Sequence, residues 1–129
     1  MNLLLDTHIF LWLNSAPEKL PASAERACCD PTNKLFLSLV SPWEIQIKQQ
    51  LGKLQLQADL SDLIQTQRNE NNLQILPIEL DHIYALSHLP YHHNDPFDRL
   101  LIAQAQVESM TLVTVDKKIC QYDLKIIGA

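Results

Sequence analysis

Acidic residues that follow apolar runs are the part of this sequence best suited to chemistry. Asp6 comes directly after an apolar run of the first five residues, and Asp116 comes directly after a second run, Thr111–Val115. Glu44 lies four residues past a third run, Leu35–Val40. Short apolar runs of this kind are typical of buried strands. The carboxyl ends of parallel strands meet at one edge of a sheet, so we expect the three carboxylates to converge there.

Two more acids, Asp95 and Asp98, stand at the start of a long apolar stretch. The segment Asp95-Pro96-Phe97-Asp98 has the same pattern as Ser41-Pro42-Trp43-Glu44: a capping residue, a proline, an aromatic residue and an acid. This pattern is typical of a helix start, where an acid can cap free N–H groups and interact favourably with the helix dipole. Capping and catalysis are therefore equal alternatives for Glu44 and for Asp98, each taken alone.

Asp6 and Asp116 differ in how easily a structural role explains them. A carboxylate that closes a buried strand is itself partly buried, and a buried charge needs a cation or a metal as partner. Asp6 therefore indicates a site by itself. Asp116 stands in a turn with two lysines, where an acid is more often solvated or a helix cap. It becomes informative only together with the other acids.

Several carboxylates at one edge of a sheet predict a divalent cation. Without one they would repel each other and raise each other's pKa values. Oxygen ligands with no His or Cys cluster suit Mg²⁺ or Mn²⁺ rather than zinc. Mg²⁺ commonly shares its ligands with substrate phosphates, which favours phosphoryl chemistry. We expect the loop pair His92-His93 to be exposed, with a substrate contact as the alternative.

The elements that position these acids alternate along the chain. The strands are expected at Met1–Leu5, Leu35–Val40, Gln74–Ile78, Thr111–Val115 and Lys125–Ile127. The helices are expected at Ala22–Cys29, Pro42–Leu51, Leu60–Asn69, Leu80–Leu86 and Pro96–Ser109. Alternation of this kind predicts βαβ crossovers, and hence a three-layer α/β sandwich with a parallel sheet of four to five strands and helices on both faces. An apolar cluster around Trp12 is assigned to the core or to an interface.

Length and composition indicate one ordinary globular domain over residues 1–129. The chain has 129 residues, 47% of them hydrophobic, and a net charge of −5. It has no apolar run long enough for a membrane span and no signal-peptide pattern, so we expect a cytoplasmic protein without a membrane partner. Its two glycines stand in neither a dinucleotide-binding nor a P-loop motif, which excludes both site types.

The acidic balance has a bearing on nucleic acid as a partner. It argues against a protein that holds nucleic acid through a broad basic face. It does not exclude an enzyme whose acids hold cations. Without the five acids named above, ten acidic residues remain against ten basic residues. The net charge therefore equals the charge of the expected site.

Four segments of the chain together resemble the PIN domain family, and within it the VapC-like toxins of bacterial type II toxin–antitoxin systems. The segments are Leu3-Leu4-Leu5-Asp6-Thr7-His8, Ser41-Pro42-Trp43-Glu44-Ile45, the run from Asn94 to Ala105 that contains Asp95-Pro96-Phe97-Asp98-Arg99, and Leu112-Val113-Thr114-Val115-Asp116. The resemblance spans nearly the whole chain. It implies a PIN-like sandwich and a Mg²⁺-dependent endoribonuclease that acts on RNA, with Mn²⁺ as an alternative ion.

The resemblance also implies roles for particular residues. Asp6, Glu44, Asp98 and Asp116 match the four catalytic acids; Asp6, Asp98 and Asp116 would hold the metal, and Glu44 would bind a metal or orient water. The same match makes Asp95 a residue of the rim or a helix cap, Thr7, Ser41 and Thr114 sources of supporting hydroxyls, and Arg99 a candidate phosphate contact or the partner of a neighbouring carboxylate. A cognate antitoxin and a homodimer are the implied protein partners.

Two other functions remain as alternatives. A receiver-like signalling domain also binds Mg²⁺ through acids at strand ends. It ranks lower because the third expected strand ends Leu76-Pro77-Ile78-Glu79, without the phosphoacceptor aspartate that such a domain needs. The second alternative is a PIN domain with weak catalysis that serves as an RNA-binding or interaction module. The presence of all four motif acids gives it little support.

Overall fold

The computed structural model describes residues 1–129 and contains one parallel sheet of five strands. The strands are β1 (Asn2–Leu5), β2 (Lys34–Ser38), β3 (Gln74–Leu76), β4 (Thr111–Val113) and β5 (Ile126–Ile127). Their order across the sheet is β3-β2-β1-β4-β5, and every neighbouring pair is parallel. The predicted α/β class, with helices on both faces of a parallel sheet, is confirmed.

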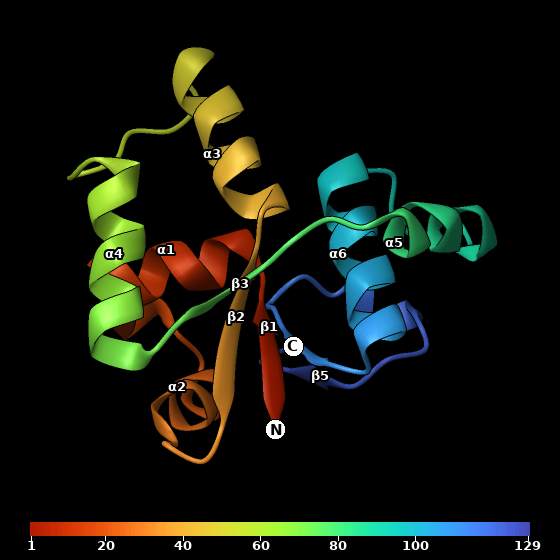
Figure 1. The fold of residues 1–129 in the computed structure, drawn as a ribbon, viewed down its shortest axis with the longest axis horizontal. Helices are drawn as coiled ribbons and strands as arrows, with labels where there is room; N and C mark the ends of the chain where they lie inside the picture. Colours follow the sequence, from red (N-terminus) through yellow and green to blue (C-terminus); the bar gives the residue numbers. More distant parts are fainter.

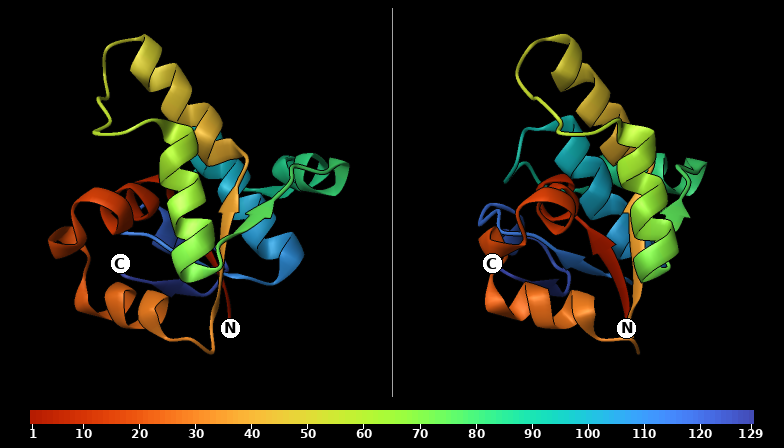
Figure 2. Two further views of the ribbon diagram at one scale, coloured as in Figure 1. Left: turned by 60° about the vertical axis from the view of Figure 1, so that its left-hand side comes forward. Right: turned by 90° about the vertical axis from the view of Figure 1, so that its left-hand side faces the viewer.

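Helices cover both faces of the sheet (Figures 1 and 2). They are α1 (Thr7–Ser15), α2 (Ala22–Cys29), α3 (Val40–Gln50), α4 (Leu60–Asn71), α5 (Leu80–Ala85) and α6 (Pro96–Glu108), with short 3₁₀ turns at Pro17–Lys19, Leu86–His88 and Ile119–Gln121. Helices α1, α2 and α4 lie on one side of the sheet, and α5 and α6 lie on the other. Helix α3 extends outward from the edge where β2 ends. No helix has the length and apolar character that a membrane span requires.

The central strand β1 is buried on both faces from Leu3 to Leu5, which explains the three consecutive leucines. Leu3 and Leu5 pack with Ile9 and Phe10 of α1 on one side. Leu4 packs on the other side in the cluster that contains the apolar residues of α6. The side chains of a strand alternate between its faces. A strand with helices on both sides is therefore apolar at every position.

The order of the strands determines where a ligand is expected. The chain proceeds from β1 outward to β2 and β3, and then crosses back to place β4 on the other side of β1. The direction of winding reverses between β1 and β4, and ligands of open α/β sheets bind beyond the carboxyl ends of the strands at such a point. A receiver-like sheet would place β1 between β2 and β3. The observed order excludes that alternative.

Helix α1 was not among the expected elements. Its residues Ile9 to Leu13 are all apolar, so the sequence has no polar face to reveal the helical period. Asp6 begins the helix as its N-cap, with the side chain accepting a hydrogen bond from the Thr7 N–H. The apolar cluster around Trp12 is therefore part of a helix that packs on the sheet.

The start of α3 also differs from expectation. The strand β2 ends at Ser38 and the helix begins at Val40, so Ser41 lies inside the helix and does not cap it. The Ser38 hydroxyl accepts the Val40 N–H instead. Pro42 is compatible with this earlier start because a proline in the first helical turn removes no helical hydrogen bond. The strands β3 and β4 likewise end two residues before their expected ends, at Leu76 and Val113.

Packing of α6 against the sheet should contribute strongly to stability. Leu101 is fully buried, whereas Val107 of the same helix is 40% exposed. We expect Leu101→Ala to lower the free energy of unfolding by about 2–5 kcal/mol because it leaves a cavity. Val107→Ala should change it by less than about 1 kcal/mol. Urea unfolding followed by circular dichroism measures both; equal losses would contradict this account of the core.

Candidate metal centre

Asp6 is held at the carboxyl end of β1 by two hydrogen bonds. Its Oδ1 accepts the Thr7 N–H at 2.7 Å, and its Oδ2 accepts the Thr114 hydroxyl at 2.7 Å. The residue is 5% exposed. Burial raises the pKa of this carboxyl above its usual value, although both hydrogen bonds oppose the change. The two threonines therefore fix the direction of a carboxylate that is costly to ionise where it lies.

Glu44 is buried on α3 and has a partner on each oxygen. Oε1 accepts a hydrogen bond from the Thr7 hydroxyl at 2.8 Å, and Oε2 accepts one from Lys48 Nζ at 2.6 Å. A further hydrogen bond of 2.9 Å joins the hydroxyls of Thr7 and Ser41. The hydrogen bond to Glu44 raises the pKa of the Lys48 ammonium. Glu44 therefore contacts side chains of the site and does not cap its helix.

Asp95 and Asp98 divide the two roles that sequence alone left open for acids at a helix start. Asp95 is the N-cap of α6: its Oδ1 accepts the N–H groups of Phe97 at 2.8 Å and Asp98 at 3.3 Å. The Asp98 carboxylate turns to the site, with Oδ2 3.0 Å from His93 Nε2. Asp95 therefore caps the helix, whereas the Asp98 carboxylate contacts His93 and feels the charges of the other acids.

The pKa of Asp98 is the most strongly perturbed among the acids of the site. Burial raises it to about 8, and the charges of Asp6, Asp95, Glu44 and Asp116 each add to the rise. Four carboxylates are therefore close enough to Asp98 to oppose its ionisation. An opposing cation would reverse this effect.

Asp116 completes the site just beyond the end of β4. Its N–H donates to the Thr114 hydroxyl at 3.0 Å, and that hydroxyl donates to Asp6, so one threonine links the ends of β1 and β4. Asp116 Oδ2 lies 2.7 Å from His93 Nε2. One potential ligand atom from each of His93, Asp98 and Asp116 lies within 4.8 Å of the other two.

The residues that the sequence pointed to thus lie together. Asp6, Glu44, Asp98 and Asp116 lie at one edge of the sheet. Thr7 links Asp6 to Glu44, Thr114 links Asp6 to Asp116, and His93 links Asp116 to Asp98. His93 was missed, because a loop pair of histidines is ordinarily exposed. It is only 9% exposed and contacts two of the acids. Its position two residues before the N-cap of α6 was the one signal that could have placed it here.

The prediction that Arg99 contacts a phosphate or pairs with a carboxylate is wrong. The residue is 6% exposed. Its guanidinium donates to backbone carbonyl oxygens, the closest being Pro90 at 2.9 Å, and lies over the ring of Tyr91. The other acceptors are the carbonyls of Leu86, Leu89 and His93 and the Tyr122 hydroxyl. A buried guanidinium needs such acceptors, so Arg99 braces the loop before α6 instead of facing a substrate.

The donor set fits a hard divalent cation. The atoms that face one another are carboxylate oxygens, together with one imidazole nitrogen. Mg²⁺ and Mn²⁺ prefer oxygen donors of this kind. The raised pKa of Asp98 indicates a concentration of negative charge that the protein itself does not neutralise. Asp6, Asp98 and Asp116 are the residues that could hold such an ion, with Glu44 beside it.

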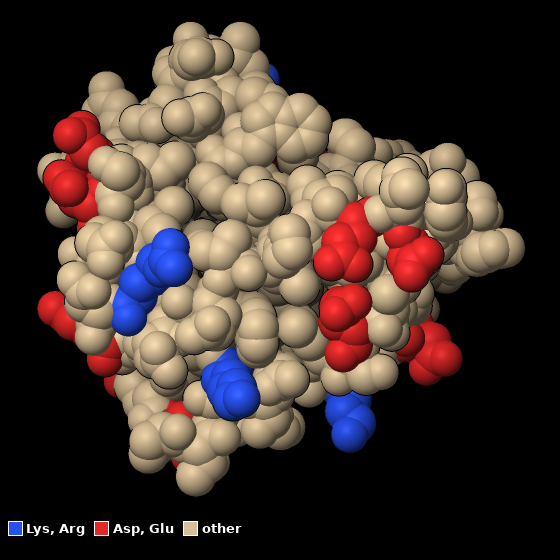
Figure 3. Space-filling model, in the orientation of Figure 1, with Lys and Arg blue, Asp and Glu red and all other residues tan.

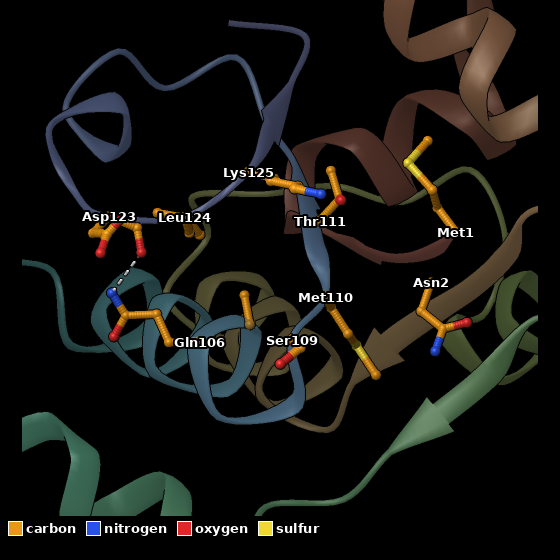
Figure 4. Close-up of a pocket in the computed structure, with 10 residues that line it drawn as sticks. Met1, Asn2, Gln106, Ser109, Met110, Thr111, Asp123, Leu124 and Lys125 are labelled. Carbon is orange, nitrogen blue, oxygen red and sulfur yellow. Dashed lines mark hydrogen bonds between the residues drawn. The ribbon is translucent and has the colours of Figure 1, made fainter.

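The largest cleft of the molecule lies elsewhere. It has a volume of about 590 Å³ and is formed where the strands begin, by residues that include Asn2, Thr111 and Lys125. Figure 4 shows that these side chains come from opposite walls and that Gln106 donates to the backbone of Asp123. Asp123 is its one acidic residue. This cleft lacks the set of convergent acids found at the other edge of the sheet.

The model of the PIN domain family matches residues 3–125. This chain belongs to the PIN domain family. The PIN domain resembles, in fold, a chain in the structure of VapBC2 from Rickettsia felis bound to a promoter DNA fragment. The TM-score is 0.72, and the identity is 18% over 98% of this chain and 97% of that one. It also resembles a chain of VapBC-1 from nontypeable Haemophilus influenzae, with a TM-score of 0.63 and 19% identity over 98% and 96% of the two chains. A comparison with curated protein sequences gives no match.

The stability of this PIN domain without metal should fall as the pH rises from 5 to 8. Asp98 has a pKa of about 8 in the folded chain, whereas an aspartate in the unfolded chain has a pKa of about 4. Between these values the folded chain keeps a proton that the unfolded chain releases, so a higher pH favours unfolding. Asp98→Asn should remove much of this slope and raise the free energy of unfolding at pH 8 by about 1–2 kcal/mol.

Urea unfolding in EDTA at pH 5, 6.5 and 8 measures the effect. The control is Asp123→Asn, which neutralises an exposed acid outside the site. Parallel pH profiles for the wild type and Asp98→Asn would contradict the assignment.

Proposed function

We propose that this PIN domain is a Mg²⁺-dependent endoribonuclease, with Mn²⁺ as an alternative ion, and that it acts in the cytoplasm as the toxin of a type II toxin–antitoxin pair. The observation that carries the proposal is the crowding of four acids around Asp98, whose pKa rises to about 8. These acids come from the ends of β1 and β4 and the starts of α3 and α6, the region where the winding of the sheet reverses.

The side chains of the site have distinct roles, and together these roles suit hydrolysis of a phosphodiester. Asp6, Asp98 and Asp116 would hold the cation, which supplies charge for the phosphate oxygens and lowers the pKa of water. Glu44 is directed by its hydrogen bonds to Thr7 and Lys48, so it can accept a hydrogen bond from an attacking water and orient it. The threonine hydroxyls on Asp6 and Glu44 hold these carboxylates in place before substrate binds.

An antitoxin is the proposed protein partner. The structural relatives named above are VapBC assemblies, and another relative is described as a toxin–antitoxin complex from Klebsiella pneumoniae, with a TM-score of 0.60 and 18% identity over 95% of this chain and 93% of that one. A cleft of about 260 Å³ between α1 and the segment after α3 has an apolar lining that includes Leu11, Trp12 and Leu56. It is a suitable seat for apolar side chains of an antitoxin segment.

A homodimer is supported by exposed apolar side chains on α3 and α5. Trp43 is 55% exposed, Leu80 67% and Tyr84 62%. Figure 3 shows that the part of this face formed by α3 has few charged atoms, whereas acids gather on the right-hand side, at and below α5. Large exposed apolar side chains are candidates for a protein–protein interface.

Cleavage of RNA in vitro tests the proposed activity. We expect the wild type to cleave a mixed RNA substrate with Mg²⁺ or Mn²⁺ and to lose activity in EDTA. Asp6→Asn keeps the size of the side chain but removes its charge, so cleavage should fall by about 100-fold or more. Asp62→Asn, an exposed acid on α4, should retain full activity. Equal cleavage by the wild type with Mg²⁺, the wild type with EDTA, and Asp6→Asn would reject the enzyme.

Expression in a bacterial host tests the proposed role as a toxin. Induction of the wild type should arrest growth and yield new RNA 5′ ends, whereas induction of Asp98→Asn to the same protein level should do neither. Unarrested growth with RNA cleavage in vitro would keep the nuclease and reject the toxin. RNA binding without turnover in vitro would favour the alternative of a PIN domain that serves only as an RNA-binding module.

A further inference from the structure

His93 occupies an unusual place between two of the acids. Its Nε2 lies 2.7 Å from Asp116 Oδ2 and 3.0 Å from Asp98 Oδ2. The other ring nitrogen, Nδ1, accepts the Asp95 N–H at 3.1 Å. All three neighbours of the ring are thus residues of the site or of the helix start that carries it.

The hydrogen bond at Nδ1 determines where the proton of the imidazole lies. A nitrogen that accepts an N–H uses its lone pair and carries no proton of its own. The proton of the His93 ring is therefore on Nε2, which faces the two carboxylates. A protonated nitrogen has no lone pair for a metal ion, so in this arrangement His93 donates to the acids and does not act as a ligand.

The loop that carries His93 is braced so that the ring keeps this orientation. The Tyr122 hydroxyl donates to the Pro90 carbonyl at 2.7 Å and accepts the His93 N–H at 3.0 Å. Arg99 donates to the Pro90 carbonyl from the other side. A half-turn of the ring would place a carbon atom against the Asp95 N–H and lose that bond. The backbone and the ring are therefore both fixed before any ion binds.

We propose that His93 is a positioning residue that holds the Asp98 and Asp116 carboxylates at the spacing a divalent cation requires, by donating from Nε2. This inference rests on the proposed metal-dependent function. The proton that His93 donates offsets part of the repulsion between Asp98 and Asp116. Because His93 is not a ligand in this arrangement, the metal would have oxygen ligands only, which suits Mg²⁺.

Binding of Mn²⁺ without RNA tests the proposal. The measurements are the dissociation constant from the EPR signal of free Mn²⁺ and the nitrogen coupling of bound Mn²⁺ from pulsed EPR. We expect His93→Leu to weaken Mn²⁺ binding by about 10–100-fold. His93→Gln keeps an N–H donor of similar reach, so it should bind within a few-fold of the wild type. Tyr122→Phe, which loosens the loop, should weaken binding by an intermediate factor.

Either of two results would overturn the proposal if His93→Leu folds. One is an imidazole coupling in the wild type that His93→Gln abolishes, because it would make His93 a ligand. The other is equal Mn²⁺ affinity in the wild type and in His93→Leu. Circular dichroism checks that each variant folds; if His93→Leu does not, equal affinity in the wild type and Tyr122→Phe, or binding by His93→Gln that is as weak as that of Asp98→Asn, would reject it.

The outcome is separable from that of the proposed function. A wild type that binds Mn²⁺ in the expected order of variants but cleaves no RNA would reject the ribonuclease and keep the role of His93. A wild type that cleaves RNA while His93→Leu binds Mn²⁺ normally would reject the role of His93 and keep the ribonuclease.

Discussion

Repulsion among partly buried carboxylates at one edge of the sheet is the constraint on which the rest of this structure depends. Like charges in a region of low dielectric disfavour ionisation of one another, and the pKa of Asp98, at about 8, records the effect. The chain opposes the repulsion only in part. Thr7 and Thr114 donate hydrogen bonds, and Lys48 pairs with Glu44 at the margin. The remaining negative charge is what a divalent cation would neutralise.

The fold explains how so many acids come together. Asp6 follows the central strand β1, and Asp116 follows β4, its neighbour across the point where the winding of the sheet reverses. Both strands are short and end in buried apolar residues, so the acids mark the positions where the buried sheet ends. Glu44 and Asp98 come from near the starts of α3 and α6, which begin near the carboxyl ends of these strands. A rigid sheet thus supplies two carboxylates, and the first turns of two helices supply the others.

The sequence predicted the sheet and the four acids better than the contacts that hold them. Apolar runs predicted the strands because a strand buried on both faces shows no alternation of apolar and polar residues. Helix α1 was missed for the related reason that residues Ile9 to Leu13 are apolar throughout. His93 and Arg99 were misjudged because their partners are distant in sequence or are backbone groups: Asp116 for His93, and the carbonyls of the preceding loop for Arg99. No local pattern encodes such partners.

The site also bears on stability, because the arrangement that favours metal binding disfavours the metal-free fold. Burying acids that repel one another lowers the stability of the folded chain at neutral pH, and functional sites commonly carry such a cost. A ligand that binds only the folded form stabilises it in proportion to the logarithm of its concentration over its dissociation constant. Side chains that lower the repulsion without occupying the metal position therefore serve both states. The Nε2–H of His93 and the hydroxyl of Thr114 have that property, since each donates to a carboxylate oxygen and adds no negative charge to the site.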